Sequence, residues 1–182
     1  MKNRFVAGLL LAVAAALTVL LGEAWGLDLV GVTVLGLSLG AAAAVIGGGT
    51  LGFRVAGVVV GVLLTWAAYA LRAAVLPDSD LGRAVGFALL FAAIGLVAAL
   101  AVGRLPFWSL LLGAAALAGA YEAAYTANPP LFASESVSAV TSVLLTLVIG
   151  LLAATAAGVD PTARRGAHED RTQTARTMEN AR

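Results

Sequence analysis

The sequence predicts an all-α polytopic membrane protein, a bundle of six transmembrane helices with both termini in the cytoplasm. Hydrophobic residues make up 61% of the 182 residues and charged residues 12%, whereas a soluble domain carries about 25% charged residues. The charged residues are concentrated in short stretches that separate six long apolar segments. Lys and Arg gather on one side of these segments, which is the charge pattern of a multi-pass membrane protein.

Each of the six apolar segments is long enough to cross a bilayer as a helix. A hydrocarbon core of about 30 Å requires roughly 17–25 apolar residues of helix. The segments are apolar throughout, which favours helices, because barrel strands alternate apolar and polar residues. We predict spans at about 5–22, 29–48, 52–71, 84–103, 106–125 and 137–158. Residues 1–159 would form this transmembrane domain, and the polar residues 160–182 a disordered cytoplasmic tail.

Glycine, proline and polar residues mark the connections between the predicted spans. The helix-breaking residues are Gly47–Gly49 after the second span, Pro77 after the third, and Gly103 and Pro106 between the fourth and the fifth. Residues 123–134 contain an Asn-Pro-Pro sequence and are predicted to form a loop. Asp80 is expected to cap the fourth span, and Ser134 or Ser136 the sixth, because such side chains accept hydrogen bonds from free helix N–H groups.

The orientation of the bundle follows from the positions of Lys and Arg. With the N-terminus in the cytoplasm, nine basic residues fall on the inner side and two, Arg72 and Arg83, on the outer side. Arg54 lies at a short inner turn and is expected to reach the lipid headgroups. These features predict a cell-membrane protein with both termini inside. The alternative for residues 1–24 is a cleaved signal peptide, which would leave five spans.

Several classes of function are excluded by residue types that the chain lacks. It has no Cys, and its one His, His168, lies in the polar tail. Thiol chemistry, histidine metal centres and a Ser-His-Asp triad are therefore absent from the apolar domain. A net charge of +1 gives no electrostatic footprint for nucleic acid. We predict no catalytic residue, no cofactor and no metal site, with the lipid bilayer as a partner.

Glu122 is the strongest candidate for a functional polar residue, and Glu23 is the second. Glu122 lies at the outer end of the fifth span between Tyr121 and Tyr125, and Glu23 ends the first span. A charged group at the edge of the hydrocarbon is costly, so it often marks a ligand or ion contact. The alternative is an interfacial carboxylate that water solvates or that pairs with one of the two outer arginines.

Small residues at four-residue spacing predict close helix packing. Inside a bilayer such residues let helix backbones approach, because water exclusion cannot drive association there. The rows include Gly36 and Gly40 in the second span, Gly57 and Gly61 in the third, Ala115, Gly119 and Ala123 in the fifth, and Ser138, Ser142 and Thr146 in the sixth. We expect these faces to pack within one bundle. The alternatives are that the sixth helix meets a second copy or a partner membrane protein, or that its hydroxyls line a polar path.

Internal similarity along the chain is weak. Residues 4–8, 53–57 and, more faintly, 83–86 resemble one another, which suggests three duplicated helical hairpins. The missing catalytic groups and the small-residue faces favour a structural or accessory membrane subunit without catalytic activity. The alternative is a small transporter or channel for a neutral or weakly polar solute, which would fit six spans and the hydroxyls of the sixth.

Overall fold

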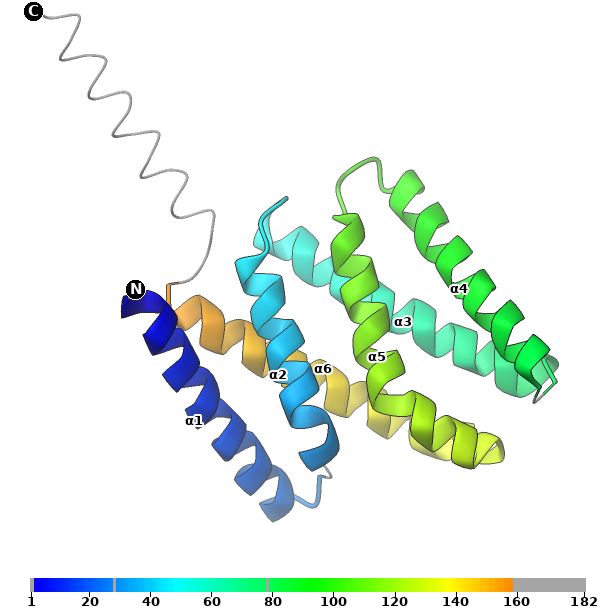
Figure 1. Cartoon of the computed structure of the whole chain (residues 1–182), viewed down its shortest axis with the longest axis horizontal. Coiled ribbons are helices and arrows are strands. Elements are labelled where there is room, and N and C mark those ends of the chain that lie inside the picture. The colour runs from blue at the N-terminus through cyan, green and yellow to red at the C-terminus, as the bar shows by residue number, and fades with distance from the viewer. Residues whose placement is uncertain (1, 28, 78, 159–182) are drawn as a thin grey trace, which may run out of the picture.

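The computed structural model describes residues 2–27, 29–77 and 79–158, and these residues form a bundle of helices without β-strands (Figure 1). The helices are α1 (Lys2–Ala24), α2 (Val30–Val45), α3 (Leu51–Val75), α4 (Asp80–Leu100), α5 (Phe107–Ala127) and α6 (Phe132–Ala156), with a short 3-10 helix, η1 (Pro129–Leu131). Five of them, all but α2, are long and apolar enough to cross a membrane. The predicted helical bundle is therefore confirmed, while the predicted tail, residues 160–182, lies outside the described residues.

Helix α2 is shorter than the predicted second span, 29–48. It has 16 residues, which is about 24 Å of helix. It ends at Val45 because Ile46 turns to an extended conformation with a ψ of 122°. Gly48 and Gly49 then adopt positive φ angles of 109° and 72°, which residues with a Cβ rarely reach. The glycine run thus ends the helix three residues earlier than the sequence analysis placed it.

The connection between the last two helices is shorter than the loop predicted at 123–134. Helix α5 continues to Ala127, the two prolines begin η1, and α6 begins at Phe132. Proline fits this place because a first helical turn does not need the N–H that proline lacks. The expected loop is thereby reduced to Asn128 and a single 3-10 turn.

Two helix caps also differ from the predicted ones. Ser79, and not Asp80, caps α4, and its Oγ accepts from the Gly82 N–H at 3.2 Å. Neither predicted serine caps α6, whose N-cap position has no side-chain hydrogen bond. Instead the Ser134 hydroxyl donates to the Leu131 carbonyl at 2.9 Å, because the preceding 3-10 turn already uses the free backbone groups there.

Two close crossings, α2 with α6 and α3 with α5, form the centre of the bundle. At the first crossing the facing pairs are Gly36 with Thr146, Gly40 with Leu147, and Gly150 with Leu37. At the second crossing they are Ser109 with Gly57, Gly113 with Val58, and Leu110 with Gly61. A Cβ added at any of these glycines would overlap the facing atoms. The helix backbones therefore touch directly, as small residues permit inside a membrane.

The two crossings are copies of one arrangement. A shift of 73 residues carries Gly36, Leu37 and Gly40 of α2 onto Ser109, Leu110 and Gly113 of α5. A shift of 89 residues carries Gly57, Val58 and Gly61 of α3 onto Thr146, Leu147 and Gly150 of α6. The flanking helices follow the same rule, since α1 packs on α6 and α2 while α4 packs on α3 and α5. The halves α1–α3 and α4–α6 are thus two copies of a three-helix unit.

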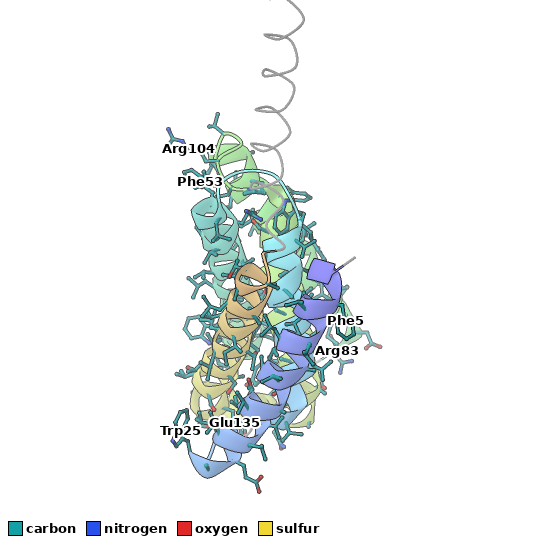
Figure 2. The ribbon with its side chains drawn as sticks, turned by 90° about the vertical axis from the view of Figure 1, so that its left-hand side faces the viewer. Phe5, Trp25, Phe53, Arg83, Arg104 and Glu135 are labelled. Atoms are coloured by element: carbon teal, nitrogen blue, oxygen red, sulfur yellow. The ribbon has the colours of Figure 1, made fainter. Side chains whose placement is uncertain are left out.

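These two units are inverted relative to each other. Each has three helices that run alternately from one end of the bundle to the other, so the second unit begins at the end opposite to the first. Figure 1 shows that α1 and α4 begin at opposite ends of the bundle. We call the end where α2 passes to α3 the α2–α3 end, and the end where α3 passes to α4 the α3–α4 end. In Figure 2, Phe53 and Arg104 lie at the α2–α3 end, whereas Trp25 and Glu135 lie at the opposite one. The architecture is therefore an inverted repeat of three helices.

Candidate functional site

A buried ion pair joins α3 and α5 near the α3–α4 end. Arg72 Nη1 lies 3.3 Å from Glu122 Oε1 and 3.1 Å from Oε2, so it donates to both carboxylate oxygens. The hydroxyl of Tyr69, one helical turn before Arg72, donates to Glu122 Oε2 at 2.6 Å. The Arg72 side chain is only 6% exposed and that of Glu122 32%. A charge-assisted pair this sheltered is stronger than a surface salt bridge, because less water competes with it.

Aromatic rings enclose the guanidinium of Arg72. Its Cζ lies 4.6 Å from the ring centroid of Tyr125, 5.4 Å from that of Phe87 and 5.5 Å from that of Tyr69. These distances fall within the range of cation–π attraction. The rings also contact one another, with Tyr69 5.1 Å from Tyr125 and 5.5 Å from Tyr121. The cluster is therefore a polar centre whose arginine is sheltered by aromatic rings and whose carboxylate is partly exposed.

Helical spacing and one glycine explain how the sequence builds this cluster. Tyr69 and Arg72 are three residues apart, as are Glu122 and Tyr125, so each pair lies on one helix face. The α3–α5 crossing turns these two faces toward each other. Gly86 of α4 makes room for the arginine stem, because a Cβ there would lie 2.9 Å from Arg72 Cδ and Cγ.

An apolar cleft begins at this cluster and continues toward the middle of the bundle. It has a volume of about 470 Å³ and is open on one side. Helix α3 contributes Thr65, Ala68, Tyr69 and Arg72, helix α4 contributes Gly86, Phe87, Leu90 and Phe91, and helix α5 contributes Leu111, Ala114, Ala115 and Ala118. Small residues on α5 and α3 create the hollow, and among the described residues that line it Arg72 is the one with a charge. Such a site, apolar with a polar group at one end, is typical of ligand pockets.

Arg54 does not reach outward to lipid headgroups as the sequence analysis expected. Its side chain is fully buried at 0% exposure, and Nη1 donates to the carbonyls of Ala43, Ala44 and Ile46 at 3.2, 3.0 and 3.0 Å. The early end of α2 explains the difference, since the last carbonyls of a helix have no partner within it. Arg54 supplies that partner and ties the start of α3 to the end of α2.

The structure brings together some of the predicted site residues and separates others. Glu122, Tyr121 and Tyr125 belong to the cluster, whereas Glu23 is exposed in the last turn of α1, which packs on α6 and α2. Gly36, Gly40 and Thr146 lie in the α2–α6 crossing, while Ser142 is half-buried and Ser138 exposed. The Thr146 hydroxyl donates back to the Ser142 carbonyl at 2.8 Å. These hydroxyls therefore do not line one polar path across the described part of the bundle.

Sequence reasoning missed Tyr69 and the helical face of α5 that packs on α3. The candidate residues from the sequence do not include Tyr69, although its position three residues before Arg72 is the available signal. On α5 the small residues in the crossing are Ser109 and Gly113, and not the row of Ala115, Gly119 and Ala123. Within the described ranges no group of three His, Cys, Asp or Glu could hold a metal ion.

No protein-family model, curated protein sequence or solved structure matches the chain.

Proposed function

We propose that the chain is a multi-pass membrane protein of the cell membrane, with both termini inside, that moves a small neutral or weakly polar solute across the bilayer. The observation that carries this proposal is the inverted repeat of α1–α3 and α4–α6. Two copies of one unit, inserted in opposite directions, have equivalent packings that open toward opposite sides. Alternating access in many transporters uses this relation.

The cluster and the cleft support the choice of solute. Arg72 and Glu122 cancel each other's charge, and the remaining walls of the cleft are almost wholly apolar. A charged group that entered the apolar part of the cleft would have no compensating partner there, which costs free energy in a low-dielectric environment. A neutral solute with an apolar part and a hydrogen-bonding group loses little water and finds both environments in the cleft.

A second candidate is the accessory or structural subunit that the sequence favoured. The observation in its favour is that buried hydroxyls in the core bond to backbone carbonyls of their own helices, as Thr33, Thr65 and Thr146 do. Such bonds leave these hydroxyls little capacity for a passing solute. Yet the small-residue faces of α2 and α6 cover each other, so a partner would bind elsewhere on the bundle.

Transport in sealed liposomes tests this function. The purified protein is reconstituted into liposomes. The influx of glycerol and urea, and the movement of a fluorescent phospholipid analogue between the two leaflets, are compared with those in protein-free vesicles. We expect a protein-dependent rate for at least one of the three, reduced in the neutral double variant Arg72→Gln/Glu122→Gln. Rates equal to those of empty vesicles for all three, together with a stoichiometric membrane protein that co-purifies from native membranes, would favour the accessory subunit.

The proposed orientation has its own test, because the chain contains no cysteine. Single variants Ser79→Cys and Val102→Cys place a thiol in exposed connections at the two opposite ends of the bundle. In intact cells an impermeant maleimide should label the first variant and not the second. Labelling of both or of the second alone would contradict the proposed topology.

A further inference from the structure

We propose that the cleft between α4 and α5 binds one acyl chain of a bilayer glycerophospholipid, whose phosphate or ester oxygens accept hydrogen bonds from Arg72. Phosphatidylcholine, which carries no net charge, would be one transported solute, and in that role it rests on the function proposed above. As a bound molecule it depends only on the geometry of the cleft and its polar end.

The shape of the cleft fits a single chain. Its volume is about 470 Å³, room for on the order of fifteen methylene-sized groups at roughly 30 Å³ each. The hollow exists because α5 presents Ala114, Ala115 and Ala118 where larger side chains would fill the space. Phe91 of α4 lines the cleft and is 60% exposed, so the surface at the opening is one that lipid tails cover.

The cleft also lies at the depth that a lipid chain requires. Arg72 is three residues from the end of α3 at Val75, whereas Thr65 lines the deep part of the cleft seven residues earlier. Seven residues of helix correspond to about 10 Å. A headgroup at Arg72 therefore sits near the end of the helix, and the chain below it runs along α3 toward the middle of the bundle.

The polar end of the cleft offers donors that the protein does not use itself. Both hydrogen bonds of Arg72 to Glu122 start at Nη1, and Nε and Nη2 donate to no other residue in the described ranges. A guanidinium has five N–H donors in a fixed plane, so three remain on a residue that is only 5% exposed. Phosphate and ester carbonyl oxygens are acceptors that match this geometry.

The ion pair also predicts which lipids bind. Glu122 neutralises Arg72 at 3.1 Å, so the site gives no strong electrostatic preference for an anionic headgroup. The hydrogen bonds go to oxygens that zwitterionic and anionic glycerophospholipids share. We therefore expect phosphatidylcholine and phosphatidylglycerol to bind with affinities within about threefold of each other.

Native mass spectrometry of the full chain in mild detergent, titrated with each phospholipid, measures this binding. Ala118→Phe fills the cleft, and Ala115→Leu fills it with a smaller side chain in case the first variant does not fold. Gly95→Phe is the matched control, because it adds the same ring to α4 where nothing lies within 4 Å. We expect about tenfold weaker binding in the cleft variants and wild-type binding in the control. Unchanged affinity in both cleft variants, with a wild-type circular dichroism spectrum, would overturn the site.

The role of Arg72 is tested separately with the neutral pair Arg72→Gln/Glu122→Gln, which leaves no charge buried alone. We expect about tenfold weaker binding of both phospholipids, since a hydrogen bond to a charged donor is lost. Unchanged binding would place the headgroup elsewhere.

Movement of a fluorescent phosphatidylcholine across liposomes, read by dithionite quenching, separates the two proposals. Binding in the cleft without movement refutes transport and leaves the site standing. Movement that Ala118→Phe and Ala115→Leu leave unchanged, together with unchanged phospholipid affinity in both variants, refutes the site and leaves transport standing.

Discussion

The close crossing of α3 and α5 gives a direct prediction for the variant Gly61→Ala. The added Cβ would overlap the carbonyl oxygen of Leu110 and lie 2.9 Å from its carbon and 3.0 Å from the nitrogen of Ala114. These are backbone atoms inside a helix, so no side-chain rotation relieves the contact. The two helices must instead move apart by roughly 1 Å, a gap that forfeits a quarter to a half of each dispersion contact across the crossing.

The size of the effect follows from these contacts. Overpacking a well-packed interior costs about 1–3 kcal/mol, and the lost dispersion across the crossing adds to that, so we expect about 2–4 kcal/mol of destabilisation. Gly95→Ala is the matched control on α4, because its Cβ meets nothing within 4 Å. There the substitution gains helix propensity, up to about 1 kcal/mol. At roughly 2–4 °C per kcal/mol for a chain of this size, the Tm values of the two variants should differ by about 10 °C.

Thermal unfolding in detergent, followed by circular dichroism, measures the difference between the two variants. Equal Tm values for Gly61→Ala and Gly95→Ala would refute the direct backbone contact. The inverted repeat adds a second requirement, because Gly150 occupies the place in α6 that Gly61 occupies in α3. Gly150→Ala should therefore cost the same within about 1 kcal/mol. A difference of more than about 2 kcal/mol would show that the two crossings are not equivalent.

Three further predictions concern the contacts of Arg54, of Tyr69 and of Arg72. Arg54→Gln should destabilise the bundle by about 2–4 kcal/mol, because three carbonyls, two of them in buried hydrogen bonds, share its guanidinium. The exposed control Arg104→Gln should stay within about 0.5 kcal/mol in the same melts, and equal Tm values would contradict the buried role. A double-mutant cycle of Tyr69→Phe with Glu122→Gln in denaturant titrations should give a coupling free energy of about 1–3 kcal/mol. Additive effects would mean that the 2.6 Å hydrogen bond from the Tyr69 hydroxyl to Glu122 contributes nothing to stability. In Gly86→Ala the added Cβ would lie 2.9 Å from the stem of Arg72. It should displace that stem and weaken phospholipid binding, and wild-type binding would argue against the contact.

The helices were predictable because long apolar stretches bounded by charged residues are a strong signal in the sequence. Long stretches without charge placed every helix, and their ends fell within a few residues of the observed ones. The end of α2 was harder to predict from the sequence, because the glycine run at 47–49 shows where the chain turns but not how early the helix ends. The position of Arg54 depends on that early end, and so its burial could not be read from sequence spacing alone.

The candidate site was half predictable. Glu122 and an arginine partner were expected from their shared outer location, and the structure selects Arg72. The contribution of Gly86 could not be predicted, because it depends on how α4 lies against α3.

The inverted repeat left only a faint trace in the sequence. Its two crossings use Gly36 and Gly40 in one half and Ser109 and Gly113 in the other, and any small residue serves at such places. The similarity of residues 4–8, 53–57 and 83–86 suggested three hairpins, whereas the structure has two units of three helices, and 83–86 opens α4, which runs opposite to α1. An inverted second half accounts for this, because it makes α4 run in the direction opposite to α1.

The order of synthesis gives the two crossings different histories. During synthesis the partner of Gly57 in α3, Ser109, follows after 52 residues. The partner of Gly36 in α2, Thr146, follows only after 110 residues. At roughly 5–20 residues per second, the shortest helix of the bundle spends about 5–20 s beside the ribosome with its glycine face uncovered. During that interval a chaperone or a neighbouring chain has access to a surface that the finished protein never presents.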